Sequence, residues 1–171
     1  ISGLTERKVK VQRLVALASQ FQRKGGELNI ENAKGLMVEA KAMTNPFPDD
    51  EDELADLMEV VRGYSTVEPE VAFRLMEPMI DQFNEMVQAT AVLSKYNKRD
   101  RSFKKGELVM KVNGNPGGLL AFRYIPQIQM LGSADVERMS TMVDRFQRTD
   151  ARTIMKLYVL QGYLRFSRVG M

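Results

Sequence analysis

Two similar stretches of sequence, MEPMIDQF at residues 76–83 and MSTMVDRF at residues 139–146, decide the predicted fold class. In each stretch Met, Met, Ile or Val, and Phe recur at positions i, i+3, i+4 and i+7, which places four apolar side chains on one side of an α-helix. A second similar pair, Val60–Tyr64 and Val159–Tyr163, supports the same interpretation. Repeated segments predict repeated helical units, and a chance match between amphipathic helices is the alternative.

Apolar residues at helical spacing continue through most of the chain, between residues that break helices. Gly25–Gly26 predicts the end of the first helix, because glycine favours the left-handed turn found there. Asn45–Pro48 predicts a second break, and Pro78 predicts a kink or two consecutive helices, because proline lacks a backbone N–H. Gly132 predicts another helix end. We therefore predict an all-α fold of about seven helices, packed as antiparallel hairpins in a short repeat array.

The acidic run Asp49–Glu53 stands where a third helix is expected to begin. Acidic side chains at a helix start interact favourably with the positive end of the helix dipole. A cation site is the alternative, but the run lacks the spacing of a calcium-binding loop, with its central Gly and terminal Glu. The sequence favours a capping role for these residues.

Residues 97–118 interrupt the helical pattern with a basic and glycine-rich segment. Phe103–Lys105 and Leu108–Val112 flank Gly106 and predict a small β-hairpin, which needs support from the helices because two short strands alone are marginally stable. We expect one domain over residues 1–171, with N-terminal helices in 1–96, a polar basic insertion in 97–118 and C-terminal helices in 119–171. In the last helix we expect an inner face that contains Ile154, Leu157, Tyr158, Leu160 and Leu164.

The first predicted helical hairpin resembles a tetratricopeptide-type repeat. The resemblance rests on small and apolar residues on the two helices and on the turn between them: Leu14, Ala18, Gly25–Glu27, Ala33, Leu36 and Ala40. It covers about 40 residues and lacks the aromatic and Gly-x-x-Tyr positions of the full consensus. The second half is similar in style to uncharacterised bacterial helical-repeat proteins. The resemblance implies stacked hairpins with a concave surface for peptide segments of partner proteins, and no functional residue transfers from it.

The composition excludes several classes of chemistry. The 171 residues include no Cys and no His, so thiolate nucleophiles, histidine general bases and the usual zinc ligands are absent. No apolar run approaches the roughly 20 residues of a membrane-spanning helix. Residues 49–81 carry eleven acidic and two basic side chains, whereas residues 82–125 carry eight basic and three acidic ones. With an acidic block beside the basic one, the net charge of +3 does not favour nucleic-acid binding.

The chain begins with Ile1, so we expect it to be a piece of a longer protein, and the sequence is compatible with the cytoplasm or an exported location. Twelve Met residues are expected to fill the core, with a Met-lined groove as the alternative. Asp81 and Asp144 recur in the two similar stretches, where a helix contact or a solvated edge is expected and not catalysis. No cofactor or metal site is predicted.

We interpret the chain as a non-catalytic module that binds or scaffolds proteins. One alternative is a small-molecule or enzymatic domain with a cavity between helices and the insertion as a lid. Another is a binder of anionic partners through the insertion, for which a solvated loop is the plainer interpretation. The candidate partner-binding residues are Lys98, Arg99, Arg101, Phe103, Lys104, Lys105 and Lys111.

Overall fold

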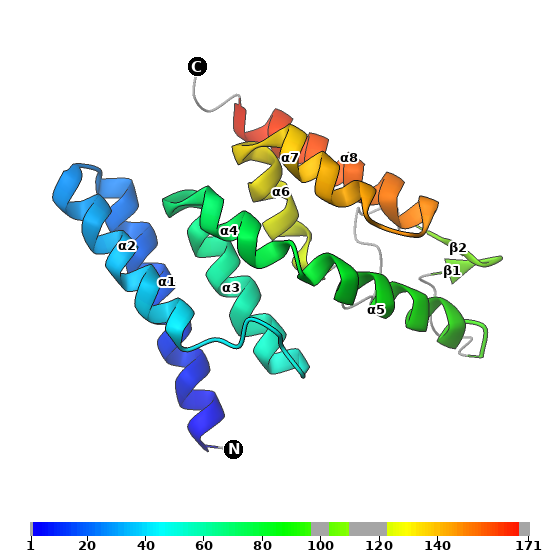
Figure 1. The fold of residues 1–171 in the computed structure, drawn as a ribbon, viewed down its shortest axis with the longest axis horizontal. Coiled ribbons are helices and arrows are strands. Elements are labelled where there is room, and N and C mark those ends of the chain that lie inside the picture. Colours follow the sequence, from blue (N-terminus) through cyan, green and yellow to red (C-terminus); the bar gives the residue numbers. More distant parts are fainter. Residues whose placement is uncertain (1, 97–102, 110–122, 168–171) are drawn as a thin grey trace. The chain divides into compact units, whose positions relative to one another are not determined.

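A computed structural model describes residues 2–96, 103–109 and 123–167 of the chain. These residues form eight helices and one two-stranded β-hairpin, which confirms the all-α fold with a small hairpin (Figure 1). The chain divides into two compact units, Ile1–Met76 and Glu77–Met171, and each is described by itself. The prediction of one domain over the whole chain stays a prediction.

The first unit contains four helices: α1 (Ser2–Lys24), α2 (Glu27–Ala42), α3 (Glu51–Val67) and α4 (Pro69–Met76). Gly25 and Gly26 join α1 to α2 with φ angles of 67° and 84°, so the predicted glycine turn is confirmed. These angles suit glycine because a Cβ makes the left-handed region costly. The two helices lie side by side as a hairpin, and α3 packs against both (Figure 1).

The core of this unit is built from apolar side chains at the helical spacing that the sequence predicts. Fully buried members on the first three helices are Val11, Val15, Ala18, Ala33, Met37, Ala40, Leu57, Met58 and Val61. Gly63 lies within α3, which continues to Val67. A Cβ at Gly63 would lie 2.6 Å from Cε of Met37 and 3.0 Å from Cγ1 of Val15, so the absence of a side chain lets α3 approach α1 and α2 closely.

The acidic start of α3 is paired with basic residues of α1. Asp50 caps the helix by accepting a hydrogen bond from the backbone N–H of Glu53 at 2.8 Å, as expected of a capping residue. Lys8 lies 3.1 Å from the Asp52 carboxylate, and Nε of Arg7 donates to Oδ2 of Asp56 at 3.3 Å. Burial raises the pKa of Asp56 above its ordinary value, although the positive charge of Arg7 opposes the shift.

The second unit contains the remaining helices and the hairpin. Its elements are α5 (Met79–Leu93), β1 (Phe103–Lys104), β2 (Glu107–Leu108), α6 (Ile125–Ala134), α7 (Val136–Asp144) and α8 (Thr149–Ser167). Helices α6, α7 and α8 pack against one another in pairs (Figure 1). Because α4 ends at Met76 and α5 begins at Met79, the helix break predicted at Pro78 is confirmed.

Two glycines bring α6 and α8 into close contact. A Cβ at Gly162 in α8 would lie 2.1 Å from the carbonyl oxygen of Gln129, and a Cβ at Gly132 in α6 would lie 2.9 Å from the carbonyl oxygen of Val159. The expectation that Gly132 ends a helix is wrong, because α6 continues to Ala134. Both glycines serve interhelical packing, where the missing side chain outweighs the cost of glycine inside a helix.

The two similar stretches bury all of their repeated apolar side chains. These are Met76, Met79, Ile80 and Phe83 in the first copy and Met139, Met142, Val143 and Phe146 in the second. The copies do not occupy equivalent places in helices: the first spans the break between α4 and α5, whereas the second begins inside α7 and ends beyond it. The two copies therefore share the same pattern of buried side chains but do not form the same structural unit.

The residues around the two copies contact each other within the second unit. Arg145 lies 2.8 Å from the Asp81 carboxylate, and Asp144 pairs with Lys156 of α8 at 2.7 Å. The buried Asn84 donates to the carbonyl of Arg145 at 3.0 Å and accepts from the backbone N–H of Gln147 at 2.9 Å. Helix α5 is thus fastened to the loop between α7 and α8.

Candidate functional site

The β-hairpin presents part of the predicted partner-binding segment. Its strands are antiparallel, with Phe103 opposite Leu108 and Lys104 opposite Glu107. Lys105 and Gly106 form the turn with φ angles of 53° and 85°. Positive φ at both central residues matches the right-handed twist of a hairpin. The predicted hairpin is confirmed in a shorter form, with a second strand at Glu107–Leu108.

Arg148, directly before α8, and Asp150, in its first turn, hold the hairpin in place. The carboxylate of Asp150 accepts a hydrogen bond from the backbone N–H of Leu108 at 2.8 Å, and the guanidinium of Arg148 donates to the carbonyl of Gly106 at 2.7 Å. The same guanidinium lies 5.1 Å from the ring centroid of Phe103 and forms an ion pair with Asp150 at 2.7 Å. These contacts supply the helical support that a two-stranded hairpin needs.

Electrostatics keep Asp150 ionised in this arrangement. Burial on its own raises the pKa of the Asp150 carboxyl, but hydrogen bonds from Arg148, from the backbone of Leu108 and from the backbone of Ala151 lower it further than burial raises it. The pKa of Asp150 therefore lies below its ordinary value. An ionised acceptor strengthens each hydrogen bond that it receives.

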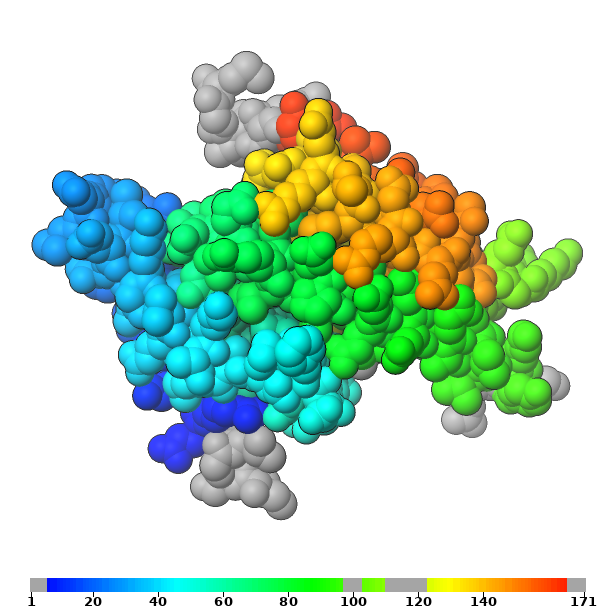
Figure 2. Space-filling model, in the orientation of Figure 1, coloured from blue at the N-terminus to red at the C-terminus, as the bar shows by residue number. Residues whose placement is uncertain are grey.

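The structure brings together three of the seven predicted partner-binding residues. Lys104 and Lys105 are exposed on the hairpin. Figure 2 shows the hairpin, in light green, beside the orange start of α8. Phe103 is half-buried under Arg148, so its ring supports the hairpin more than it offers a contact surface. The other predicted residues, Lys98, Arg99, Arg101 and Lys111, lie outside the described residues.

Helix α8 carries a second feature, an apolar outer face. Ile154 and Tyr158 are buried as expected, but Leu157, Leu160 and Leu164 are 52%, 49% and 59% exposed. The expectation of one inner face with all five residues is therefore wrong. Their spacing of i, i+3 and i+7 places the three leucines in one row on the side of the helix away from the core.

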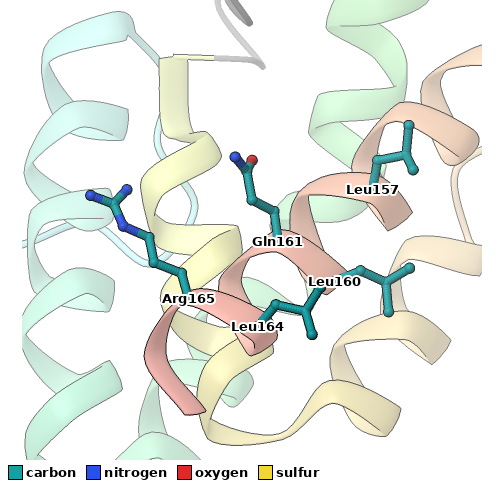
Figure 3. A pocket seen from close by; sticks show the side chains of 5 residues that line it. All are labelled: Leu157, Leu160, Gln161, Leu164 and Arg165. Carbon is teal, nitrogen blue, oxygen red and sulfur yellow. The ribbon is translucent and has the colours of Figure 1, made fainter. Parts of the chain in front are cut away.

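The leucine row forms one wall of an open groove of about 790 Å³. Gln161 and Arg165 also line it, and Figure 3 shows these two side chains beside the leucines on α8. The amide of Gln129 in α6 donates to Oε1 of Gln161 at 2.9 Å, which joins this edge of the groove to the neighbouring helix. We call Leu157, Leu160 and Leu164 the α8 stripe.

Within residues 2–96, 103–109 and 123–167, no three acidic residues are grouped so that they could bind a metal ion. No helix in the same ranges is long and apolar enough to cross a membrane. Among the described residues, three leucines, one amide and one guanidinium line the groove, a set that binds apolar and hydrogen-bonding surfaces.

Sequence reasoning missed the α8 stripe because it assigned every apolar residue of the last helix to the core. The signal was present: apolar residues occur on opposite sides of the helix, and a surface helix needs only one such side to pack. The anchoring pair Arg148 and Asp150 was missed because nothing local in the sequence connects it with a hairpin more than 40 positions earlier.

Comparison of the chain with protein-family models, with curated proteins and with solved structures found no match.

Proposed function

We propose that this chain is a helical protein-binding module whose contact surface is the α8 stripe. The observation that carries the proposal is the exposure of three consecutive leucines of one helical row in a helix whose opposite face is already packed. Contiguous apolar surface of this kind on a folded protein marks interaction sites more often than isolated exposed residues do. A partner helix that covered the stripe would remove this apolar surface from water, which favours association.

Two further observations support a binding role. Gly132 and Gly162 hold α6 and α8 in close contact, so the stripe lies on a helix that is firmly attached to its neighbour. A preorganised surface loses little conformational entropy on binding. The tetratricopeptide-like resemblance of residues 14–40 is compatible with the proposal, since stacked helical hairpins of that type bind peptide segments.

A display library of natural protein fragments, selected on the immobilised chain, tests the proposal. The double variant Leu157→Ser and Leu160→Ser removes the centre of the stripe without adding charge. Leu93→Ser is the matched control, because Leu93 is an exposed leucine on α5 of the same unit. We expect enriched fragments that bind the parent chain and the control but not the double variant. Selection of fragments that bind the parent chain and the double variant equally well would contradict the proposal.

A second candidate function is binding of an anionic partner through the hairpin. Lys104 and Lys105 support it, because both are exposed on a hairpin that Arg148 and Asp150 hold in place. Binding of oligonucleotides or acidic vesicles that weakens steeply with salt would favour this candidate, because released counterions drive such association. Loss of that binding in Lys104→Gln with Lys105→Gln would assign it to the hairpin, and salt-insensitive binding would reject it.

A further inference from the structure

The outer row of α8 is longer than its three leucines. Asp150, Thr153, Leu157, Leu160 and Leu164 follow one another at alternating steps of three and four residues. This is the spacing of the a and d positions of a heptad repeat, along which a second helix packs side by side with the first. The row therefore has the pattern of one half of a short two-helix interface.

The hairpin lies at one end of this row. Asp150, the first residue of the row, accepts the hydrogen bond from the backbone of Leu108, and Arg148 holds the turn through the carbonyl of Gly106. A helix lying along the row would thus run from Leu164 toward the hairpin that carries Lys104 and Lys105; Figure 1 shows this hairpin beside the start of α8. The α8 stripe and the two lysines of the hairpin thus become parts of one surface.

The charges along this surface are mainly positive. Residues 151–167 contain three basic side chains, Arg152, Lys156 and Arg165, and no acidic one. Asp144 of α7 offsets the charge of Lys156 at 2.7 Å, whereas Arg152 donates only to the uncharged carbonyl of Phe146. Between Lys104 and Leu108 the hairpin adds two lysines against Glu107.

This charge distribution argues against a second copy of the chain as the occupant. Two copies of α8 placed row to row would bring basic side chains against basic side chains, and like charges across an interface oppose association. Three partly exposed leucines also make a smaller interface than the roughly 800 Å² per partner of a stable complex. An acidic helix has the opposite charge to this surface, and a small contact area suits a transient partner.

We propose that the α8 stripe receives an amphipathic helix of another protein, with leucine-like residues at a and d positions and acidic residues beside them. This inference rests on the proposed function and adds the chemistry of the partner. The apolar row supplies the contact area, and Lys104 and Lys105 on the hairpin together with Arg165 in the groove lining select for acidic flanks. Docking of an amphipathic helix by i, i+3 and i+7 anchors is an established mode of peptide recognition.

Two synthetic helical peptides of about two heptads test the inference. Both carry Leu at the a and d positions, but one carries Glu and the other Lys at the flanking e and g positions. Fluorescence anisotropy with the full chain measures binding. We expect the Glu peptide to bind about tenfold more tightly than the Lys peptide, with the difference shrinking at high ionic strength as salt screens the charges.

Variants of the chain assign the binding to the stripe and to the hairpin. Leu157→Ser with Leu160→Ser is expected to weaken binding of the Glu peptide about tenfold or more, because two central anchors are lost. Lys104→Gln with Lys105→Gln is expected to weaken it roughly two- to fivefold, the effect of exposed charge pairs. Leu93→Ser is expected to leave it unchanged.

Several outcomes would overturn the inference. Equal, stripe-dependent binding of the two peptides would reject the acidic flanks and leave the proposed function standing. Sedimentation equilibrium that finds a dimer of the parent chain but not of the leucine double variant would identify a second copy as the occupant. Failure of both peptides to bind would reject an acidic helix, while the fragment selection would still decide separately whether the stripe binds another protein.

Discussion

The carboxylate of Asp150 accepts a hydrogen bond from the backbone N–H of Leu108 at 2.8 Å, and so joins the hairpin to the first turn of α8. Arg148 pairs with the same carboxylate and also donates to the hairpin turn at Gly106. One acidic side chain therefore connects the basic segment that the sequence singled out with the helix that carries the α8 stripe.

Replacing this carboxylate by an amide is expected to loosen the hairpin. Asp150→Asn removes a charged acceptor from three donors and should destabilise the second unit by about 1–3 kcal/mol. Asp144→Asn is the matched control, because Asp144 forms only an exposed ion pair with Lys156. Its loss should cost about 0–1 kcal/mol. Urea denaturation measures both values, and faster hydrogen exchange at the Leu108 amide in the first variant alone would locate the effect.

A side chain at Gly162 is expected to push α8 away from α6. The new Cβ of Gly162→Ala would meet the backbone of Gln129 at 2.1 Å, and backbone cannot move aside as a flexible side chain can. Overpacking of this kind costs about 1–3 kcal/mol or more. Gly35→Ala in α2 is the control, since nothing lies within 4 Å of its Cβ position.

The control should stabilise the protein by roughly 0.5–1 kcal/mol, because alanine restricts the unfolded chain and suits a helix interior. Thermal denaturation of the two variants should therefore give melting temperatures on opposite sides of the parent value. An unchanged melting temperature for Gly162→Ala would contradict the close packing of α6 and α8.

Asn84 is expected to contribute more to the stability of the fold than an exposed polar side chain does. Its amide satisfies the carbonyl of Arg145 and the backbone N–H of Gln147, both at the turn before α8. Asn84→Ala leaves two partly buried backbone groups without these partners and should cost about 1–3 kcal/mol. Asn84→Asp keeps an acceptor for Gln147 but places a carboxylate oxygen against the Arg145 carbonyl, so it should also lower the stability. Equal stability of the parent and this variant in urea would contradict the two hydrogen bonds of Asn84.

The two faces of α8 are expected to respond differently to truncation. Met155 is fully buried, so Met155→Ala should cost about 2–5 kcal/mol through lost contacts and a cavity. Leu157→Ala alters a side chain on the exposed face and should change stability by about 0.5 kcal/mol or less. Comparable losses for the two variants in chemical denaturation would mean that the stripe is part of the core after all.

Lowering the pH is expected to change the stability contributions of Asp56 and Asp150 in opposite directions. The pKa of Asp56 is raised by burial against the opposing charge of Arg7, so the folded state takes up a proton more readily than the unfolded chain. Its contribution to stability should increase as the pH falls from neutrality through this raised pKa.

The pKa of Asp150 is lowered, so its stabilising contribution is present above the ordinary aspartate pKa of about 3.9 and is lost as the pH falls through the folded value. NMR titration of the two carboxyl carbons, with an aspartate in a model peptide as reference, measures both shifts. Midpoints on the same side of the reference would contradict the opposite environments of the two residues.

Local residue chemistry predicted several features correctly. Gly25–Gly26 ends α1 and Pro78 separates α4 from α5, because glycine and proline act on the backbone itself and need no distant partner. The hairpin around Gly106 was predicted for the same reason, since a tight turn requires positive φ. Capping by the acidic run depended only on the first turn of α3.

Features that depend on distant partners were not predicted. Gly132 resembles a helix end in sequence, yet it lies inside α6, at a place where the backbone of Val159 leaves no room for a Cβ. Arg7 is 49 positions from Asp56, and only the packing of α1 against α3 makes the pair. No local pattern distinguishes these roles from a helix break or a solvated charge.

The sequence by itself determined that this chain is helical, where many of its helices end and that it contains no Cys and no His, because spacing, glycine, proline and composition act locally. Only the tertiary structure decided which apolar face of α8 is covered. Leu157 and Met155 are equally apolar in the sequence, and the packing of α6 and α7 against one side of the helix buries Met155 and leaves Leu157 exposed.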